Sequence, residues 1–256
     1  MSQSSAQVSA PKTKYLADYQ KPDFTIKTVD LNFDLHDDIT HVTSKMSIKR
    51  QGAALAPLVL DGKDMTLQSV MVDGKSVVYK ADKETLTIEN VPDEFELVIA
   101  NDIDPASNTA LEGLYMSNGM FCTQCEAQGF RRITYFLDRP DVMSVFTTTV
   151  IADKKMYPVL LSNGNKLQCH DSFDDRHGVT WLDPHPKPSY LFALVAGDSL
   201  SKFEAIDAGD HYYAVRAINR FGESALTVLS GTAVTTVLGS VVDLQFTAGT
   251  GGRTHQ

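Results

Sequence analysis

Residues 29–35 read VDLNFDL, with an apolar side chain at every odd position and a polar side chain between each pair. This period of two predicts a β-strand with one buried and one solvated face, because successive side chains of a strand point to opposite sides. Residues 42–49 (VTSKMSIK) alternate in the same way. The fold is therefore expected to be built from strands.

Further strand-like runs follow at intervals of about ten residues, a spacing typical of antiparallel sandwiches. They cover residues 58–60, 67–72, 76–79, 85–88 and 95–100, with turn signals at Asp61-Gly62, Asp73-Gly74, Asn118-Gly119 and Asn163-Gly164. One short helix is predicted over residues 139–145, where Pro140 can occupy the first turn. The predicted fold class is all-β: an antiparallel sandwich or a large curved, saddle-like sheet with one short helix.

Composition narrows the classes of partner. The 256 residues carry a net charge of −9, which argues against nucleic-acid phosphates and anionic membrane surfaces as partners. Three cysteines cannot all pair in internal disulfides, and residues 1–14 lack the apolar core of a signal peptide. We expect a cytoplasmic protein with a flexible leader over residues 1–14 and a folded β domain over residues 15–198.

The C-terminal part, residues 199–256, differs from the rest of the chain in amino-acid composition. Residues 225–242 hold no charged side chain, so a membrane span has to be considered. Ser, Thr and Gly are frequent in this run, and its Thr and Val content favours strands over a membrane helix. A short β-rich segment of separate origin is predicted, with no membrane span.

Most of the candidate functional residues lie in residues 111–146 (LEGLYMSNGMFCTQCEAQGFRRITYFLDRPDVMSVF). Cys122 and Cys125 have C-x-x-C spacing, which occurs in structural zinc sites and in thioredoxin-like redox sites. Cys169 and His170 could complete a zinc shell, but adjacent residues of a strand point apart. The redox alternative lacks the alternation of strands and helices that such sites use. The third interpretation is that all three cysteines act as small hydrophobic side chains in a reduced protein.

Gln124 and Glu126 offer a different site. They are two residues apart, so on an extended segment they project from the same side. A carboxylate beside an amide can bind an ammonium group, because the carboxylate supplies charge and both groups accept hydrogen bonds. The alternative is that Glu126 is an ordinary surface carboxylate paired with Arg131 or Arg132.

The order T-Q-x-E-A (residues 123–127), R-R (131–132) and D-x-P (138–140) is far more specific than C-x-x-C alone. With residues 111–115 (LEGLY) and 190–198 (YLFALVAGD), it resembles the N-terminal domain of aminopeptidase N, in its proteobacterial form. That family consists of zinc metallopeptidases of the gluzincin type, which remove N-terminal residues from peptides. The resemblance covers about three quarters of the chain.

The resemblance implies roles for individual residues. Gln124 and Glu126 would hold the free α-amino group of a peptide substrate beside a neighbouring catalytic domain. Asp138 and Pro140 would fix the turn into the short helix, and the two arginines at 131 and 132 would form structural ion pairs. No catalytic residue, metal ligand or cofactor is predicted within this chain, although zinc is the cofactor of the parent family.

The catalytic motifs of that family do not occur in these 256 residues. No histidine begins H-E-x-x-H, which would supply two zinc ligands and a general base, and G-x-M-E-N is absent. The likeness ends near Asp198. The chain is therefore expected to be inactive alone and to end before the catalytic domain, which a separate chain could supply.

Residues 212–225 (YYAVRAINRFGESA) resemble the last two strands of a fibronectin type III domain. The rest of such a domain is missing, so the unpaired strands could make the protein prone to aggregation, and otherwise a monomer is expected. This part is either a functional fusion or an accidental junction. The rival to the peptidase interpretation is a noncatalytic binding or structural β module whose C-terminal part mediates protein contacts.

Overall fold

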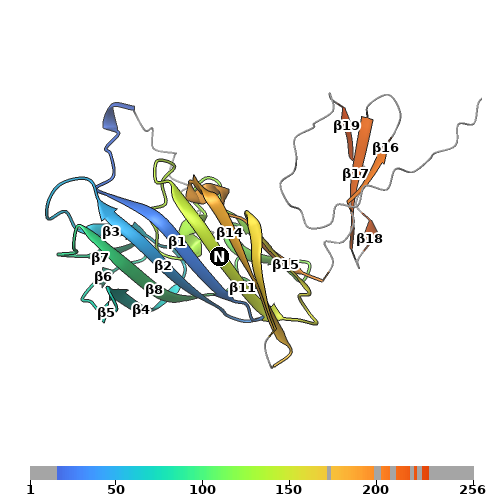
Figure 1. The fold of residues 1–256 in the computed structure, drawn as a ribbon, viewed down its shortest axis with the longest axis horizontal. Helices are drawn as coiled ribbons and strands as arrows, with labels where there is room; N and C mark the ends of the chain where they lie inside the picture. Colours follow the sequence, from blue (N-terminus) through green and yellow to red (C-terminus); the bar gives the residue numbers. More distant parts are fainter. Residues whose placement is uncertain are drawn as a thin grey trace, which may run out of the picture.

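The computed structural model describes residues 16–171 and 174–198, and the strand residues 203–207, 212–219, 222–223 and 227–230. The described residues form strands and short 3₁₀ helices, which confirms the all-β prediction (Figure 1). The helices are η1 (Leu16–Asp18), η2 (Phe130–Arg132) and η3 (Ser189–Leu191).

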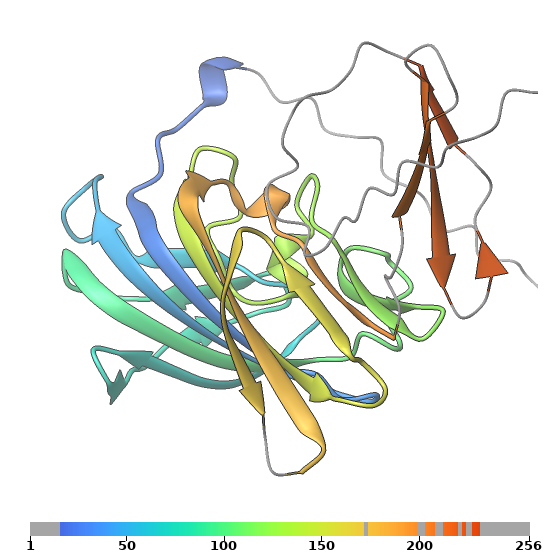
Figure 2. The same ribbon diagram turned by 45° about the vertical axis from the view of Figure 1, so that its right-hand side comes forward.

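The largest element is an eight-stranded sheet. Its strands, in spatial order, are β13 (Asn165–Asp171), β14 (Arg176–Lys187), β11 (Ser144–Asp153), β1 (Phe24–Asp34), β2 (Thr40–Arg50), β8 (Glu94–Ile103), β4 (Thr66–Val72) and β5 (Lys75–Ser76). Only β1 and β11 pair in parallel among these neighbours. The turned view shows this sheet as a curved layer with the shorter strands on one side (Figure 2).

Two smaller sheets complete the sandwich. One contains β3 (Leu58–Asp61), β7 (Thr85–Ile88) and β6 (Lys80–Ala81). The other contains β12 (Val159–Ser162), β15 (Leu194–Gly197), β10 (Met120–Gln124) and β9 (Gly113–Ser117). Buried side chains from all three sheets, such as Phe33, Leu60 and Phe121, belong to one hydrophobic core.

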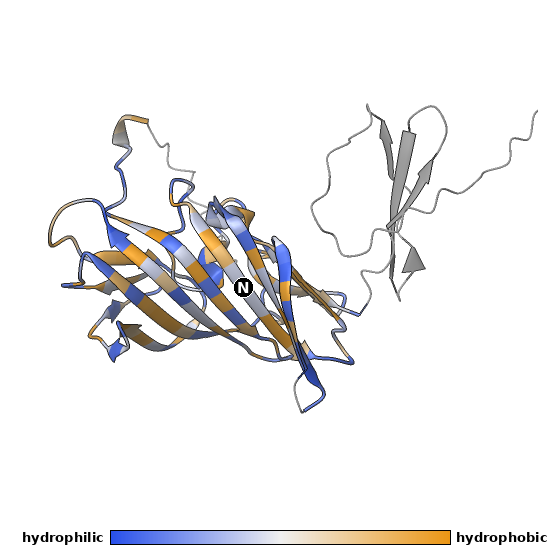
Figure 3. Ribbon diagram, viewed as in Figure 1, coloured by the Kyte–Doolittle hydropathy of each residue, from blue (hydrophilic) through white to orange (hydrophobic). Residues whose placement is uncertain are grey.

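The period of two in the sequence is reproduced as alternating burial. Along β2 every second side chain is buried, and hydrophobic and hydrophilic residues alternate along the strands of the large sheet (Figure 3). In β1 the buried positions shift by one residue between Ile26 and Val29. The pairing with β2 has an irregularity there, between Ile26 and Thr28, so a bulge keeps both halves of the strand facing the core.

Three local predictions were wrong. Residues 139–145 form a turn followed by the start of β11, because Ser144 already pairs with Lys187 of β14 and the Arg139 side chain binds the carboxylate of Asp141. Only Ser76 of the predicted strand 76–79 is in a strand. Asp61-Gly62 is no hairpin turn, because Asp61 bridges to Phe136 and Gly62 packs against the ring of Tyr135.

The described strands of the C-terminal part form a sheet of their own. It contains β16 (Phe203–Asp207), β17 (Tyr212–Asn219), β18 (Gly222–Glu223) and β19 (Thr227–Ser230), and β17 pairs antiparallel with the other three. The leader at 1–14 and most of the uncharged run at 225–242 lie outside the described residues. Among the described residues, no helix has the length and apolarity needed to cross a membrane.

Candidate functional site

The two residues predicted to bind an ammonium group lie at the end of one strand. Gln124 is the last residue of β10 and pairs with Gly113 of β9, and Glu126 lies in the turn that follows. Both side chains are exposed, whereas that of Cys125 between them is 2% exposed. Gln124 Nε2 donates to the backbone carbonyl of Glu126 at 3.3 Å. Residues 124–129 are called the 124–129 loop below.

A glycine closes this loop. The backbone amide of Gly129 donates to the carbonyl of Cys125 at 2.8 Å. A Cβ atom on Gly129 would collide with the carbonyl oxygen of Gln124 and would lie 2.9 Å from the backbone nitrogen of Gly113. Both obstacles are backbone atoms, so this close return of the chain requires glycine. The peptide bond between Glu126 and Ala127 is cis.

Of the two cysteines in this region, Cys125 is buried and Cys122 is half-buried. Burial, together with the nearby negative charge of Asp138, raises the pKa of Cys125, and burial also raises the pKa of Cys122. Metal binding and disulfide exchange both use the thiolate, so these environments disfavour the zinc and redox interpretations. Cys169 is exposed on the edge strand β13, and all three cysteines are free.

Zinc does not fit the described residues. No group of three or more His, Cys, Asp or Glu side chains among them is placed to hold a metal ion. His170, the fourth ligand considered, instead has its Nε2 atom 3.0 Å from the hydroxyl of Thr180.

The alternative pairing of Glu126 with an arginine is wrong. Arg131 contacts Asp138 and Asp61, with nitrogen–oxygen distances of 3.0 and 3.2 Å. Arg132 contacts Asp64 and, at 3.0 Å, Glu112. Both arginines thus form structural ion pairs, as predicted. Within the described part of the chain, the Glu126 carboxylate has no hydrogen bond or ion pair, so it can accept one from a ligand.

Sequence reasoning missed the buried polar network behind the loop. The Asp138 carboxylate, 2% exposed, accepts hydrogen bonds from the backbone amide and Nε of Arg131 and, at 2.7 Å, from the hydroxyl of Ser189. The predicted role of Asp138 in a helical turn is therefore wrong. Asp61 joins the network, and burial raises its pKa although Arg131 beside it acts in the opposite direction.

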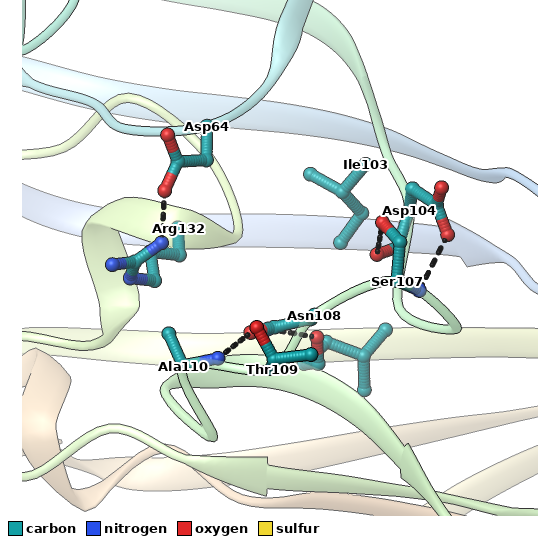
Figure 4. A pocket seen from close by; sticks show the side chains of 9 residues that line it. Asp64, Ile103, Asp104, Ser107, Asn108, Thr109, Ala110 and Arg132 are labelled. Carbon is teal, nitrogen blue, oxygen red and sulfur yellow. Dashed lines mark hydrogen bonds and ion pairs between the residues drawn. The ribbon is translucent and has the colours of Figure 1, made fainter. Parts of the chain in front are cut away.

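A separate pocket of about 280 Å³ lies nearby and was not predicted from the sequence (Figure 4). Arg132 and Asp64 face each other on one side, and the turn containing Ser107 and Asn108 lies on the other. The Asn108 side chain binds the backbone carbonyls of Glu112 and Leu114, and the Arg132 charge is already paired. The polar groups of this pocket therefore serve the fold, and neither Gln124 nor Glu126 lines it.

Comparisons with known proteins match most of this chain. Residues 18–191 match the model of the peptidase M1 N-terminal domain. Aminopeptidase N of Escherichia coli is 53% identical over 189 residues, and aminopeptidase N of Caulobacter vibrioides is 51% identical over 191 residues. Each alignment covers 73% of this chain and only 22% of the relative. The chain thus spans about a fifth of the length of these relatives.

Solved structures of aminopeptidases and M1 metallopeptidases have a similar fold. Aminopeptidase A of Legionella pneumophila, in complex with aspartic acid, is 33% identical, with a TM-score of 0.69 over 82% of this chain and 24% of that chain. An M1 zinc metallopeptidase from Deinococcus radiodurans, an E323A mutant bound to a Tyr-Ser-Ala substrate, has a TM-score of 0.62 at 15% identity. It covers 84% of this chain and 51% of that chain, and it supports the fold alone.

Proposed function

The chain belongs to the peptidase M1 N-terminal domain family, and from this premise we propose that it supplies the substrate-anchoring part of an aminopeptidase. Its role would be to bind the free amino terminus of a peptide. The observation that carries the proposal is the exposed Glu126 carboxylate, which has no partner among the described residues although two arginines lie five and six residues further along.

The chemistry of this carboxylate suits a peptidase that acts on amino termini. An α-ammonium group offers positive charge and three donors, and Glu126 with the amide oxygen of Gln124 offers matching acceptors. A peptide with an acylated amino terminus has neither the charge nor these donors. Discrimination against it would follow because the carboxylate, already desolvated on binding, would be left unpaired.

The peptide-bond cleavage itself is assigned to residues outside this sequence. The 256 residues contain no H-E-x-x-H, and we propose that zinc and the general base belong to a catalytic domain that would lie against the 124–129 loop. The comparisons favour this peptidase interpretation over a noncatalytic module whose residues 199–256 mediate protein contacts.

A domain exchange tests the anchoring role. Residues 16–198 replace the corresponding part of the Escherichia coli relative, and hydrolysis of leucyl-anilide is measured for the exchange protein and its Glu126→Gln variant. A charge-assisted hydrogen bond to the ammonium predicts a loss of kcat/KM of about 10- to 100-fold in that variant. Glu89→Gln is the matched control, because Glu89 pairs with Lys80 on β6, in another sheet. Equal activity of both variants would reject the proposal.

A further inference from the structure

The 124–129 loop is fixed at both ends to one short segment of the chain. Before the loop, Thr123 Oγ1 accepts a hydrogen bond from the Leu194 amide at 2.8 Å and lies 3.2 Å from the carbonyl of the same residue. After the loop, η2 is joined through Asp138 to Ser189, the first residue of η3. Residues 189–194 therefore hold both flanks of the loop.

Asp138 is the central group of the second attachment. Both of its carboxylate oxygens are used, Oδ2 by Arg131 and Oδ1 by Ser189, and its amide lies 3.3 Å from a carboxylate oxygen of Asp61. Burying a carboxylate so completely is unfavourable unless its partners are correctly placed. The hydrogen bonds of the Asp138 carboxylate are thus made when η2 begins immediately after Gly129, its N-cap residue.

Two contacts connect this network to the turn that contains Glu126. Gly129 is bonded to the carbonyl of Cys125, and Cys125 is buried close enough to Asp138 for that charge to raise the pKa of its thiol. Cys125 is buried and Glu126 is exposed in the turn, and both arginines of η2 are paired with other carboxylates.

We propose that Asp138, acting with Ser189 and Arg131, is a positioning residue that holds the 124–129 loop in the form in which Glu126 binds an amino terminus. This inference rests on the proposed function for the identity of the ligand, but the positioning of the loop can be measured without any ligand. Asp138 itself does not contact the peptide.

The test uses the full chain and the variants Asp138→Asn and Ser189→Ala, because the serine variant removes one hydrogen bond and keeps the ion pair. Amide hydrogen exchange is followed in residues 125–131 and, for reference, in β1 and β2. Loss of a charged network predicts faster exchange in the loop by about 10- to 100-fold for Asp138→Asn, and loss of one hydrogen bond by about 3- to 10-fold for Ser189→Ala. The reference strands should exchange as before.

Binding of leucine amide, followed by NMR shifts of the Glu126 amide, separates positioning from general stability. Asp183→Asn is the matched control, because it removes a mostly buried ion pair with Lys187 in β14. At equal loss of urea stability, Asp138→Asn should weaken leucine amide binding several-fold and Asp183→Asn should not. If Asp138→Asn fails to fold, the same measurements on Ser189→Ala test the inference.

Three results would overturn the inference: unchanged loop exchange in both variants, exchange that rises equally in the reference strands, or faster loop exchange with unchanged leucine amide binding. If the unaltered chain binds no leucine amide at all, the proposed function fails. The exchange measurements then still decide whether Asp138 positions the loop.

Discussion

At the scale of single residues, the loop depends on an inward cysteine and a glycine that fits only because it lacks a side chain. Gly129 has φ −81° and ψ −19°, a conformation that alanine adopts easily. Its requirement for glycine therefore comes from contact with the backbone of Gln124 and Gly113 and not from conformational freedom. Gly74 is the opposite case, with φ +72° and open space around it.

This contrast gives a prediction. Gly129→Ala should lower the free energy of unfolding by about 3 kcal/mol, because the added methyl group meets backbone atoms that cannot rotate away. Gly74→Ala should cost about 1 kcal/mol, the strain of a left-handed conformation. Urea unfolding of the two variants measures both values. The account of the loop fails if the Gly129 variant is no less stable than the Gly74 variant.

Residue-level prediction succeeded where the determinant is local. The spacing of Gln124 and Glu126 predicts that their side chains lie on the same side of an extended segment. In the structure both side chains are exposed and that of Cys125 between them is buried. Asp138 could not be understood in this way, because its partners Arg131 and Ser189 lie 7 and 51 residues away. A hydrogen bond over 51 residues leaves no periodic signal in the sequence.

At the scale of elements, η2 is held by an aromatic cluster beneath the loop. The ring of Phe130 lies 4.8 Å from that of Phe136, 5.3 Å from that of Phe192 and 5.9 Å from that of Phe146, between centroids. Phe146 belongs to β11, so the cluster fixes η2 on the large sheet. Such edge-on contacts add to the stabilisation from burial.

Phe130→Ala should therefore destabilise the protein by about 3–5 kcal/mol, as removal of a fully buried aromatic ring does. Leu111→Ala, at a side chain that is 57% exposed, is the comparison and should change stability little. Thermal or urea unfolding measures the difference. Similar stability of both variants would show that the cluster does not hold η2.

Strands were predicted better than their connections. The spacing of apolar residues located β1, β2, β3, β4, β7 and β8, and Asp73-Gly74 and Asn118-Gly119 form turns with positive φ at both residues. Pro140 suggested a helix, but pairing of Ser144 onward with two neighbouring strands outweighs that local preference. The sequence contains a signal for the bulge in β1, because the apolar residues move from even to odd positions between Ile26 and Val29.

At the scale of the whole molecule, the proposal gives the three sheets the role of a scaffold for the exposed carboxylate of Glu126 and assigns peptide cleavage to other residues. The described residues place no cluster of metal ligands, and the sequence contains no H-E-x-x-H. The relatives it matches are more than four times as long as the aligned part. The large sheet and its two smaller sheets therefore act, in this account, as the support of the 124–129 loop.

The 256 residues alone are accordingly expected not to hydrolyse leucyl-anilide, with or without added zinc. The Escherichia coli relative, assayed in parallel, is the positive control. Activity that follows stoichiometric zinc binding and disappears with a chelator would contradict the assignment of the chemistry to residues outside this sequence.

The central claim is that Glu126 binds a free amino terminus. The most direct measurement is a titration of the isotope-labelled chain with leucine amide and, separately, with N-acetyl-leucine amide, followed through the amide signals of residues 124–127. Because exposed ion pairs are weak, both ligands are taken to high millimolar concentration. Saturable shifts with leucine amide only, lost in Glu126→Gln, are the predicted result. Equal shifts with the acetylated ligand, or shifts that survive in Glu126→Gln, would contradict the account.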